Sequence, residues 1–279
     1  GVDFVGGRSY VVRFEQPVSQ EKIQSNLIKV LGNAEVKTFG SDNQLKITTN
    51  YKVDIDSSDI DDEINNILYT DLIEFMPENI AYEDFVVNGD ENKQAGIMSS
   101  IKVGPTIADD IKKNSFYAVF GSLIIVFLYI LLRFKNWQFS LGAVSAVFHD
   151  VLVVLGIFSL TYSFMPFNME INQAFIAAVL TVIGYSLNDT VVVFDRIREY
   201  RNINTSWELP RVVDSALNST LSRTLNTSFT TLVVLISIFV FGGESIRGFM
   251  FALIVGVLIG TYSSVFVATP VMYDTLKNK

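Results

Sequence analysis

Five long apolar runs constrain this chain more than any other feature of its sequence. Each is close to, or longer than, the roughly 17–25 residues that an α-helix needs to cross the hydrocarbon core of a bilayer. All five lie in the second half of the chain, where so many buried helices of this length would be exceptional for a soluble domain. We therefore expect five transmembrane helices. They cover about 116–132, 139–164, 174–194, 225–241 and 248–273.

Charge divides the chain at the same place. Residues 1–115 contain 20 acidic and 11 basic residues, a net charge of −9, whereas residues 116–279 contain 9 and 10, a net charge of +1. The first half is thus acidic and polar, and the second is apolar and slightly basic. We expect two domains with these boundaries. No nucleic-acid partner is expected, because the phosphates would repel the acidic half.

Several kinds of chemistry are excluded by residue type. The chain has no cysteine and one histidine, which rules out disulfide and thiolate chemistry and disfavours a structural zinc site. It has no glycine-rich nucleotide loop, nucleophile–base pair or metal-binding motif. We therefore expect neither enzymatic activity nor a cofactor. The chain starts at Gly1 without a methionine or a signal peptide, so we expect it to be a piece of a longer protein.

Basic residues predict the orientation in the membrane. Arg133 and Lys135 follow the first apolar run, and Arg196, Arg198, Arg201 and Arg211 lie between the third and fourth helices. The two loops on the opposite side contain a single basic residue, Arg247. Because basic loops stay in the cytoplasm, we expect residues 1–115 outside and the C-terminus inside. In a bacterium, this places a multi-pass protein in the cytoplasmic (inner) membrane with a periplasmic domain.

Strand and helix patterns alternate within residues 1–115. Their order, β-α-β-β-α-β, predicts a small α+β sandwich of the ferredoxin-like type. The acidic run 54–63 is typical of a solvated surface, because it lacks the glycine and the distal glutamate of an EF-hand calcium loop. The expected strands are 9–15, 34–39, 44–49, 80–87 and 97–103, and the expected helices are 19–31 and 59–69.

Two polar residues, Asn188 and Asp189, lie inside the third apolar run. A carboxylate near the centre of a membrane helix costs about 2.5–3.5 kcal/mol on insertion scales. At 1.5 Å per residue, Asp189 lies about 9 Å before Asp195, where the run ends. Arg223 enters the fourth helix from the same side of the membrane. We therefore expect Asp189 and Arg223 to meet in the inner half of the bilayer.

Two interpretations of this pair stay open. It can be a static ion pair that joins two helices, or a relay for protons or another ion. The relay is physically reasonable because a nearby cation favours the ionised carboxylate while burial favours the protonated one. His149 and Asp150 form a possible secondary relay in the second run, although a hydrogen-bonded packing role is the simpler reading. Gly256 and Gly260 indicate close helix packing in the fifth run.

Several segments resemble, in order, segments of SecF proteins. That family normally has one further transmembrane helix before the first of them. The resemblance implies that this chain is a SecF, or the SecF half of a fused SecDF chain, without its first helix. The segments are GVDFVGG at 1–7, VGPTIADDIKKNSFYA at 103–118, FHDVLVVLG at 148–156, IGYSLNDTVVVFDRIRE at 183–199, LSRTLNTSFTTL at 221–232 and IRGFMFALIVGVLIGTYSSVFVATPV at 246–271.

The resemblance also implies a function. SecD and SecF are thought to use the proton-motive force to assist preprotein export, with a fold similar to half of a resistance–nodulation–division transporter. The family's proposed proton-path acid falls on Asp189, its paired arginine on Arg223 and a second acid of the motif on Asp195, with Asn188 in the same motif. The implied partners are SecD or the SecD half of the same chain, the Sec translocon channel, unfolded exported preproteins and membrane lipid, with protons as the coupling ion.

Two rival functions fit the same sequence features. A proton-driven exporter of small molecules or lipids with the same superfold would need a larger outer domain with a substrate pocket. A structural assembly subunit without transport activity would use Asp189 and Arg223 only to hold helices together. In that case, replacing Asp189 by asparagine would reduce the stability of the protein.

Overall fold

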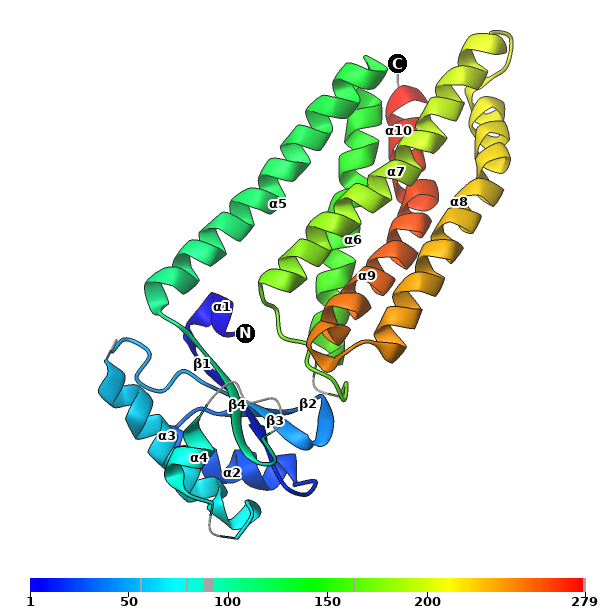
Figure 1. Cartoon of the computed structure of the whole chain (residues 1–279). Coiled ribbons are helices and arrows are strands. Elements are labelled where there is room, and N and C mark those ends of the chain that lie inside the picture. The colour runs from blue at the N-terminus through cyan, green and yellow to red at the C-terminus, as the bar shows by residue number, and fades with distance from the viewer. Residues whose placement is uncertain (56, 79, 88–92, 163, 278–279) are drawn as a thin grey trace. The chain divides into compact units, whose positions relative to one another are not determined.

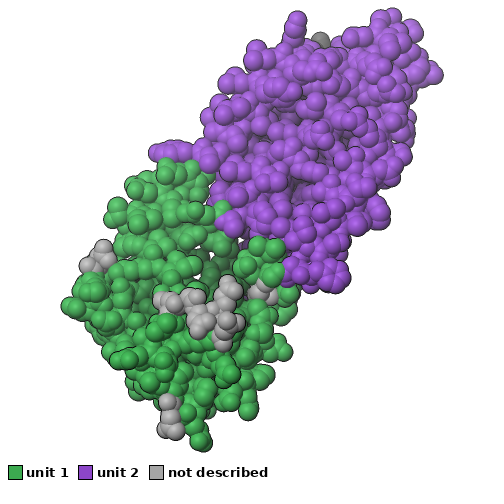
Figure 2. Space-filling view, in the orientation of Figure 1, with its two compact units in different colours: residues 1–115, 164–173, 243–248 green, residues 116–163, 174–242, 249–279 purple. Residues whose placement is uncertain are grey.

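The computed structural model describes residues 1–55, 57–78, 80–87, 93–162 and 164–277. Residues 56 and 163, in the acidic run and at the end of the second apolar run, lie outside the described residues, as do 278–279. The chain divides into two compact units (Figure 2). Unit 1 comprises residues 1–115, 164–173 and 243–248, and unit 2 comprises residues 116–163, 174–242 and 249–279.

Unit 1 is built on a four-stranded antiparallel sheet with strand order β2-β3-β1-β4 (Figure 1). Two longer helices, α2 and α3, follow β1 and β3 in the chain, so the element order is that of the expected ferredoxin-like fold. The short helix α1 precedes β1, and the 3₁₀ turn η1 directly follows α3. The bounds are α1 Val2–Val5, β1 Gly7–Arg13, α2 Gln20–Leu31, β2 Glu35–Phe39, β3 Ser41–Thr49, α3 Ser58–Leu72, η1 Ile73–Phe75 and β4 Gly96–Val103.

Helix α2 shows why the local sequence produces these elements. The Ser19 side chain accepts a hydrogen bond from the Lys22 amide at the start of the helix, and Gly32 ends it with a φ of 70°. Serine and glycine are favoured at these two positions because one satisfies a free amide and the other tolerates positive φ. The apolar residues repeat at four-residue spacing, so one face of α2 is buried.

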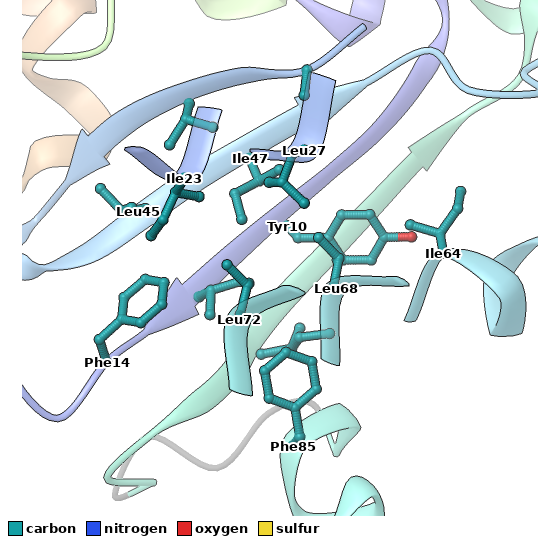
Figure 3. Close-up of a cluster of buried hydrophobic side chains, with 14 of the residues drawn as sticks. Tyr10, Phe14, Ile23, Leu27, Leu45, Ile47, Ile64, Leu68, Leu72 and Phe85 are labelled. Carbon is teal, nitrogen blue, oxygen red and sulfur yellow. The ribbon is translucent and has the colours of Figure 1, made fainter. Parts of the chain in front are cut away.

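The buried faces of both helices and of the sheet form one hydrophobic core in unit 1 (Figure 3). From α3, Ile64, Leu68 and Leu72 contribute to it, and Tyr10 and Phe14 contribute from β1 and its end. Burying large apolar side chains of this kind contributes about 1.5–3 kcal/mol each. The unit therefore has its own core.

The expected strand at 80–87 is wrong. The structure has a short helix, α4 (Tyr82–Val86), in its place, and the fourth strand is β4. The apolar residues of this segment do not alternate as a strand requires, and Glu83 and Asp84 in the first turn favour a helix N-terminus. The single turn is sufficient to place Phe85 in the core, where it is fully buried.

A buried ion pair attaches the segment 164–173 to the sheet of unit 1. Lys46 Nζ on β3 lies 2.7 Å from Glu170 Oε2, and the two side chains are 14% and 6% exposed. Thr48 donates a second hydrogen bond to Glu170. The Gln173 amide donates to Asp3 Oδ2 at 3.0 Å. The residues that immediately precede the third long helix are therefore held by the sheet and the N-terminal segment of unit 1.

The part of the chain that the structure describes contains five helical segments long and apolar enough to cross a membrane (Figure 1). This confirms the five expected spans. The first, third, fourth and fifth helices extend beyond their apolar runs because polar residues continue the helix, whereas the second begins at Trp137 and ends at Thr161, before the expected end at 164. The fifth segment is one helix with a wider π turn, η2, inside it. The bounds are α5 Pro105–Phe134, α6 Trp137–Thr161, α7 Gln173–Ile203, α8 Leu209–Phe241, α9 Glu244–Ser263, η2 Ser264–Ala268 and α10 Thr269–Lys277.

Pro270 accounts for the π turn. Proline has no amide hydrogen, so the regular helical bond to the carbonyl of Phe266 cannot form. The chain widens locally over η2, and Thr269 Oγ1 donates a compensating hydrogen bond to the Ser264 carbonyl at 2.9 Å. The last span thus continues as a helix through a proline that would otherwise break it.

Candidate functional site

Two aspartates are buried in adjacent long helices of unit 2. Asp150 on α6 is 0% exposed and Asp189 on α7 is 3% exposed. A buried carboxylate is unfavourable unless hydrogen bonds or a counter-charge compensate for lost solvation. The surroundings of each aspartate therefore indicate whether it stabilises the bundle or serves another purpose.

Asp150 is surrounded by hydrogen-bond partners. Ser186 on α7 donates to Asp150 Oδ2 at 2.6 Å, and Ser263 on α9 donates to the same oxygen at 2.8 Å. The Nδ1 atom of His149 lies 3.1 Å from Asp150 Oδ1. Both carboxylate oxygens therefore have a partner, and α6, α7 and α9 are joined at this point. Such a satisfied network is typical of structural packing.

Glycines on α9 allow the close approach that this network needs. A Cβ atom added at Gly260 would lie 2.9 Å from the Cβ of Ser186. One added at Gly256 would lie 2.0 Å from a methyl group of Val182, far inside van der Waals contact. The structure thus places Gly256 and Gly260 directly against α7, beside Ser186, the serine that donates to Asp150.

Asp189 lies three residues after Ser186, about one helical turn away, and its environment differs. Its Oδ2 atom is buried and has no hydrogen-bond partner among the residues that the structure describes. Ser228 on α8 lies close to the carboxylate, and the charge of Arg223 acts on it. Among the described residues, however, Arg223 forms no direct ion pair with Asp189. Arg223 is itself exposed, and its side chain lines a cavity.

Hydroxyl groups connect the helices around Asp189. Tyr185, one turn before Asp189 on α7, donates to Thr231 Oγ1 at 3.3 Å and approaches Ser228 Oγ at 3.5 Å. Ser228 and Thr261 on α9 share a hydrogen bond of 2.6 Å. Sequence reasoning missed Tyr185, Ser228 and Thr261 as neighbours of this site. The spacing of four between Tyr185 and Asp189 was the available signal, since it puts both on one helix face.

Asp195 lies among cations at the end of the apolar part of α7. It pairs with Arg198 at 2.8 Å and with Arg133 at 3.0 Å, and its side chain is 35% exposed. It also lines, with Arg223 and Glu199, a cavity of about 450 Å³ between α7 and α8. This cavity connects the charged helix ends to the arginine that acts on Asp189.

Asn188 is exposed on α7, although the adjacent Asp189 is buried. Several polar residues of α8, among them Asn226 and Thr230, are exposed as well. In the apolar part of α8, only 11% of the residues are buried inside the protein, against 44% in the apolar part of α7. Polar side chains exposed at membrane depth need a protein or water partner, so this face of the bundle is suited to contact another subunit.

A resident metal has no candidate ligands in the described ranges. No three histidine, cysteine, aspartate or glutamate side chains gather there closely enough to hold an ion.

Five membrane-capable helices with a buried carboxylate, joined to a ferredoxin-like domain, are the features of a multi-pass membrane transport component. Comparison with protein families defines the group. The model for the C-terminal part of the protein export membrane proteins SecD/SecF matches residues 85–278, and the SecD/SecF GG motif matches residues 1–18. The chain belongs to the SecF family.

Individual relatives of the chain are also SecF or SecDF proteins. A SecF from Rhodothermus marinus, described as a protein translocase subunit, is 45% identical over 275 residues, covering 98% of this chain and 82% of the relative. A fused SecDF from Brucella abortus is 45% identical over 170 residues, covering 61% of this chain and 22% of the relative. A crystal structure of SecDF from Thermus, a translocon-associated membrane protein, matches with a TM-score of 0.78 at 29% identity. The match covers 100% of this chain and 34% of the SecDF chain.

Proposed function

We propose that this chain is the SecF component of the bacterial Sec translocase and uses the proton-motive force, through Asp189, to assist protein export. Membership of a family whose relatives are translocase subunits supports the export role. The observation that carries the relay is the Oδ2 atom of Asp189, a buried carboxylate oxygen in the middle of a span that has no hydrogen-bond partner in the described part of the chain. A group of this kind is available to bind and release a proton.

Arg223 supplies the positive charge whose attraction to Asp189 depends on whether Asp189 carries a proton. When Asp189 is ionised, it attracts the Arg223 guanidinium across the α7–α8 contact, and protonation removes that attraction. The cavity lined by Arg223 and Asp195 offers a route for the proton to one side of the membrane. Each proton that crosses a potential of 100 mV releases about 2.3 kcal/mol, which is available to shift the two helices.

The start of α7 offers a means of transmitting this shift. Gln173, its first residue, is held by Asp3, and Glu170 just before it is paired with Lys46 on β3. A displacement of α7 therefore pulls on the sheet of unit 1, which we place in the periplasm beside the exported chain.

SecD is the proposed partner at the exposed polar face that includes Asn188 and Asn226. Fusion of the two subunits in relatives such as the Brucella SecDF supports this pairing, since fused domains are normally adjacent. The translocon channel and the unfolded preprotein complete the proposed set of partners. Protons serve as the coupling ion, without a cofactor.

Gradient-dependent export in inverted vesicles tests the relay. The full-length protein with its SecD partner is compared with its Asp189→Asn and Arg223→Ala variants, after the amount of each in the membrane is equalised. We expect at least a tenfold loss of the export that depends on the gradient. The matched control is Asp214→Asn, which removes the same charge from an exposed position on α8 and leaves export unchanged. Normal gradient-dependent export by Asp189→Asn would refute the relay.

The static interpretation fits Asp150 better than Asp189. The Ser186, Ser263 and His149 contacts satisfy its carboxylate from three directions. We therefore propose that His149 and Asp150 hold the bundle together and take no direct part in proton transfer. Retention of gradient-dependent export by a correctly folded Asp150→Asn variant is the expected result.

A further inference from the structure

A cavity of about 520 Å³ lies where α7 and α10 end and α8 begins, at one end of the bundle. Arg201 and Lys277 contribute two cations to its lining, and Glu208 contributes one carboxylate. Trp207 and Tyr273 contribute aromatic surface. The cavity is therefore basic on one part of its wall and apolar on another, and the proton relay uses none of these residues.

The two cations in this cavity have no ion-pair partner among the described residues. In the described part of the chain, neither Arg201 nor Lys277 pairs with a carboxylate. Other arginines at the same end do: Arg133 and Arg198 bind Asp195, and Arg196 binds Glu199. Unpaired cations in a concave site attract an anion, because the low-dielectric walls concentrate the field.

Trp207 gives the cavity part of its aromatic wall. Its ring lies in the connection between two membrane-capable helices, α7 and α8, and is only partly buried. The guanidinium of Arg211 lies over the ring at 4.4 Å from its centroid. Tryptophan and tyrosine are typical of the headgroup level of a bilayer, where one part of the ring is apolar and another is wet.

We propose that this cavity binds the phosphate headgroup of an anionic phospholipid. Arg201 and Lys277 contact the phosphate, while Trp207 and Tyr273 contact the glycerol and the first part of the acyl chains. A free phosphate ion would use only the cations, whereas a phospholipid also covers the apolar wall. Basic pockets between membrane helices recognise anionic headgroups by this combination. The proposal is independent of the relay at Asp189.

Quenching of Trp207 fluorescence tests the site. The chain contains two tryptophans, Trp137 and Trp207. The full-length protein with its SecD partner is placed in vesicles of phosphatidylcholine and phosphatidylglycerol in which one or the other lipid is brominated. The Trp207 signal is the difference between the complex and its Trp207→Phe variant. We expect brominated phosphatidylglycerol to quench this signal more strongly than brominated phosphatidylcholine at the same mole fraction.

Charge variants separate a site from general surface attraction. Arg201→Gln and Lys277→Gln should each weaken the preference for phosphatidylglycerol about fivefold. Glu208→Gln, which removes the opposing charge, should strengthen it. Lys135→Gln is the matched control, since it removes an exposed cation outside the cavity and should leave the preference unchanged.

Three results would overturn the proposal. Equal quenching by the two brominated lipids would show that no anionic lipid is selected. An equal loss in the Lys135→Gln control would show that bulk surface charge, and not the cavity, attracts the lipid. Relief of quenching by inorganic phosphate would assign the site to a soluble anion instead of a lipid headgroup. Far-ultraviolet circular dichroism and co-purification with SecD confirm that each variant is folded.

Discussion

Asp150 and Asp189 are both aspartates, both buried and both in the middle of long membrane helices, yet their surroundings are opposite. Asp150 receives hydrogen bonds from serines on two other helices and is close to the neighbouring His149. Within the described chain, one oxygen of Asp189 has no hydrogen-bond partner, and the Arg223 charge that acts on it forms no ion pair with it. Burial by itself therefore does not distinguish a functional acid from a structural one.

The difference lies in what protonation would change. Adding a proton to Asp150 leaves most of its neighbours in place, because serine hydroxyls can bind either form of a carboxyl group. Adding a proton to Asp189 cancels the attraction to Arg223, the cation that acts on it. A carboxylate whose counter-charge can move is suited to couple proton binding to a shift of helices.

The largest expected stability effect is that of Asp150→Ala. This change leaves the Ser186 and Ser263 hydroxyls buried without their acceptor, which costs about 2–4 kcal/mol of unfolding free energy. Asp189→Asn should cost less than about 1 kcal/mol, because no hydrogen bond to Oδ2 is lost. Denaturant unfolding in bicelles measures both. A larger loss for Asp189→Asn would reverse the assignment of the two acids and favour the structural-subunit interpretation.

Gly256→Ala should have the next largest effect on the free energy of unfolding. Its new methyl group overlaps Val182 and forces α9 away from α7, at a cost of about 1–3 kcal/mol. Gly184→Ala on α7 is the control, because no atom lies within 4 Å of the added Cβ. That control should be neutral or slightly stabilising, since alanine favours the helix. Equal thermal unfolding of the two variants would show that the close contact does not exist in the membrane.

Ser228→Ala should have a smaller effect, about 0.6 kcal/mol, which is typical of a hydrogen bond between membrane helices. The change removes the bond of 2.6 Å to Thr261 and also the contact of the Ser228 hydroxyl with the Asp189 carboxylate. Ser237→Ala, which loses only a bond to a carbonyl of its own helix, should have almost no effect. If the unfolding free energies of the two variants do not differ, the α8–α9 hydroxyl pair contributes nothing.

The smallest predicted effect depends on pH and contrasts Asp61, an acid of unit 1, with the two buried acids of the long helices. Burial alone would raise the pKa of Asp61, but hydrogen bonds from Arg8 and Lys102 outweigh it and lower the pKa. A lowered pKa contributes stability that is complete above the unfolded value of about 3.9 and is lost as the pH falls through the folded value. Asp61→Asn should therefore lower the unfolding temperature of unit 1 at pH 7 and leave it unchanged near pH 2. If Asp61→Asn still lowered the unfolding temperature near pH 2, the stabilisation would not come from the ionised Asp61 carboxylate.

The sequence by itself determined the features that depend on local composition. Run length and hydropathy predicted the five spans, and the alternation of patterns predicted the ferredoxin-like order of unit 1. The position of Asp189 inside a span follows from counting residues. These features are local because helix length, capping and side-chain periodicity depend on neighbours a few residues away.

Only the tertiary structure decided how distant residues meet. The three-helix environment of Asp150, the exposure of Asn188 beside the buried Asp189, and the absence of a direct Asp189–Arg223 contact in the described chain depend on helix rotation. A rotation of one residue, 100°, moves a side chain from the core to the surface, and hydropathy does not specify it at that precision. For the same reason, α4 formed where a strand was expected, because burying Phe85 required only that its side chain reach the core.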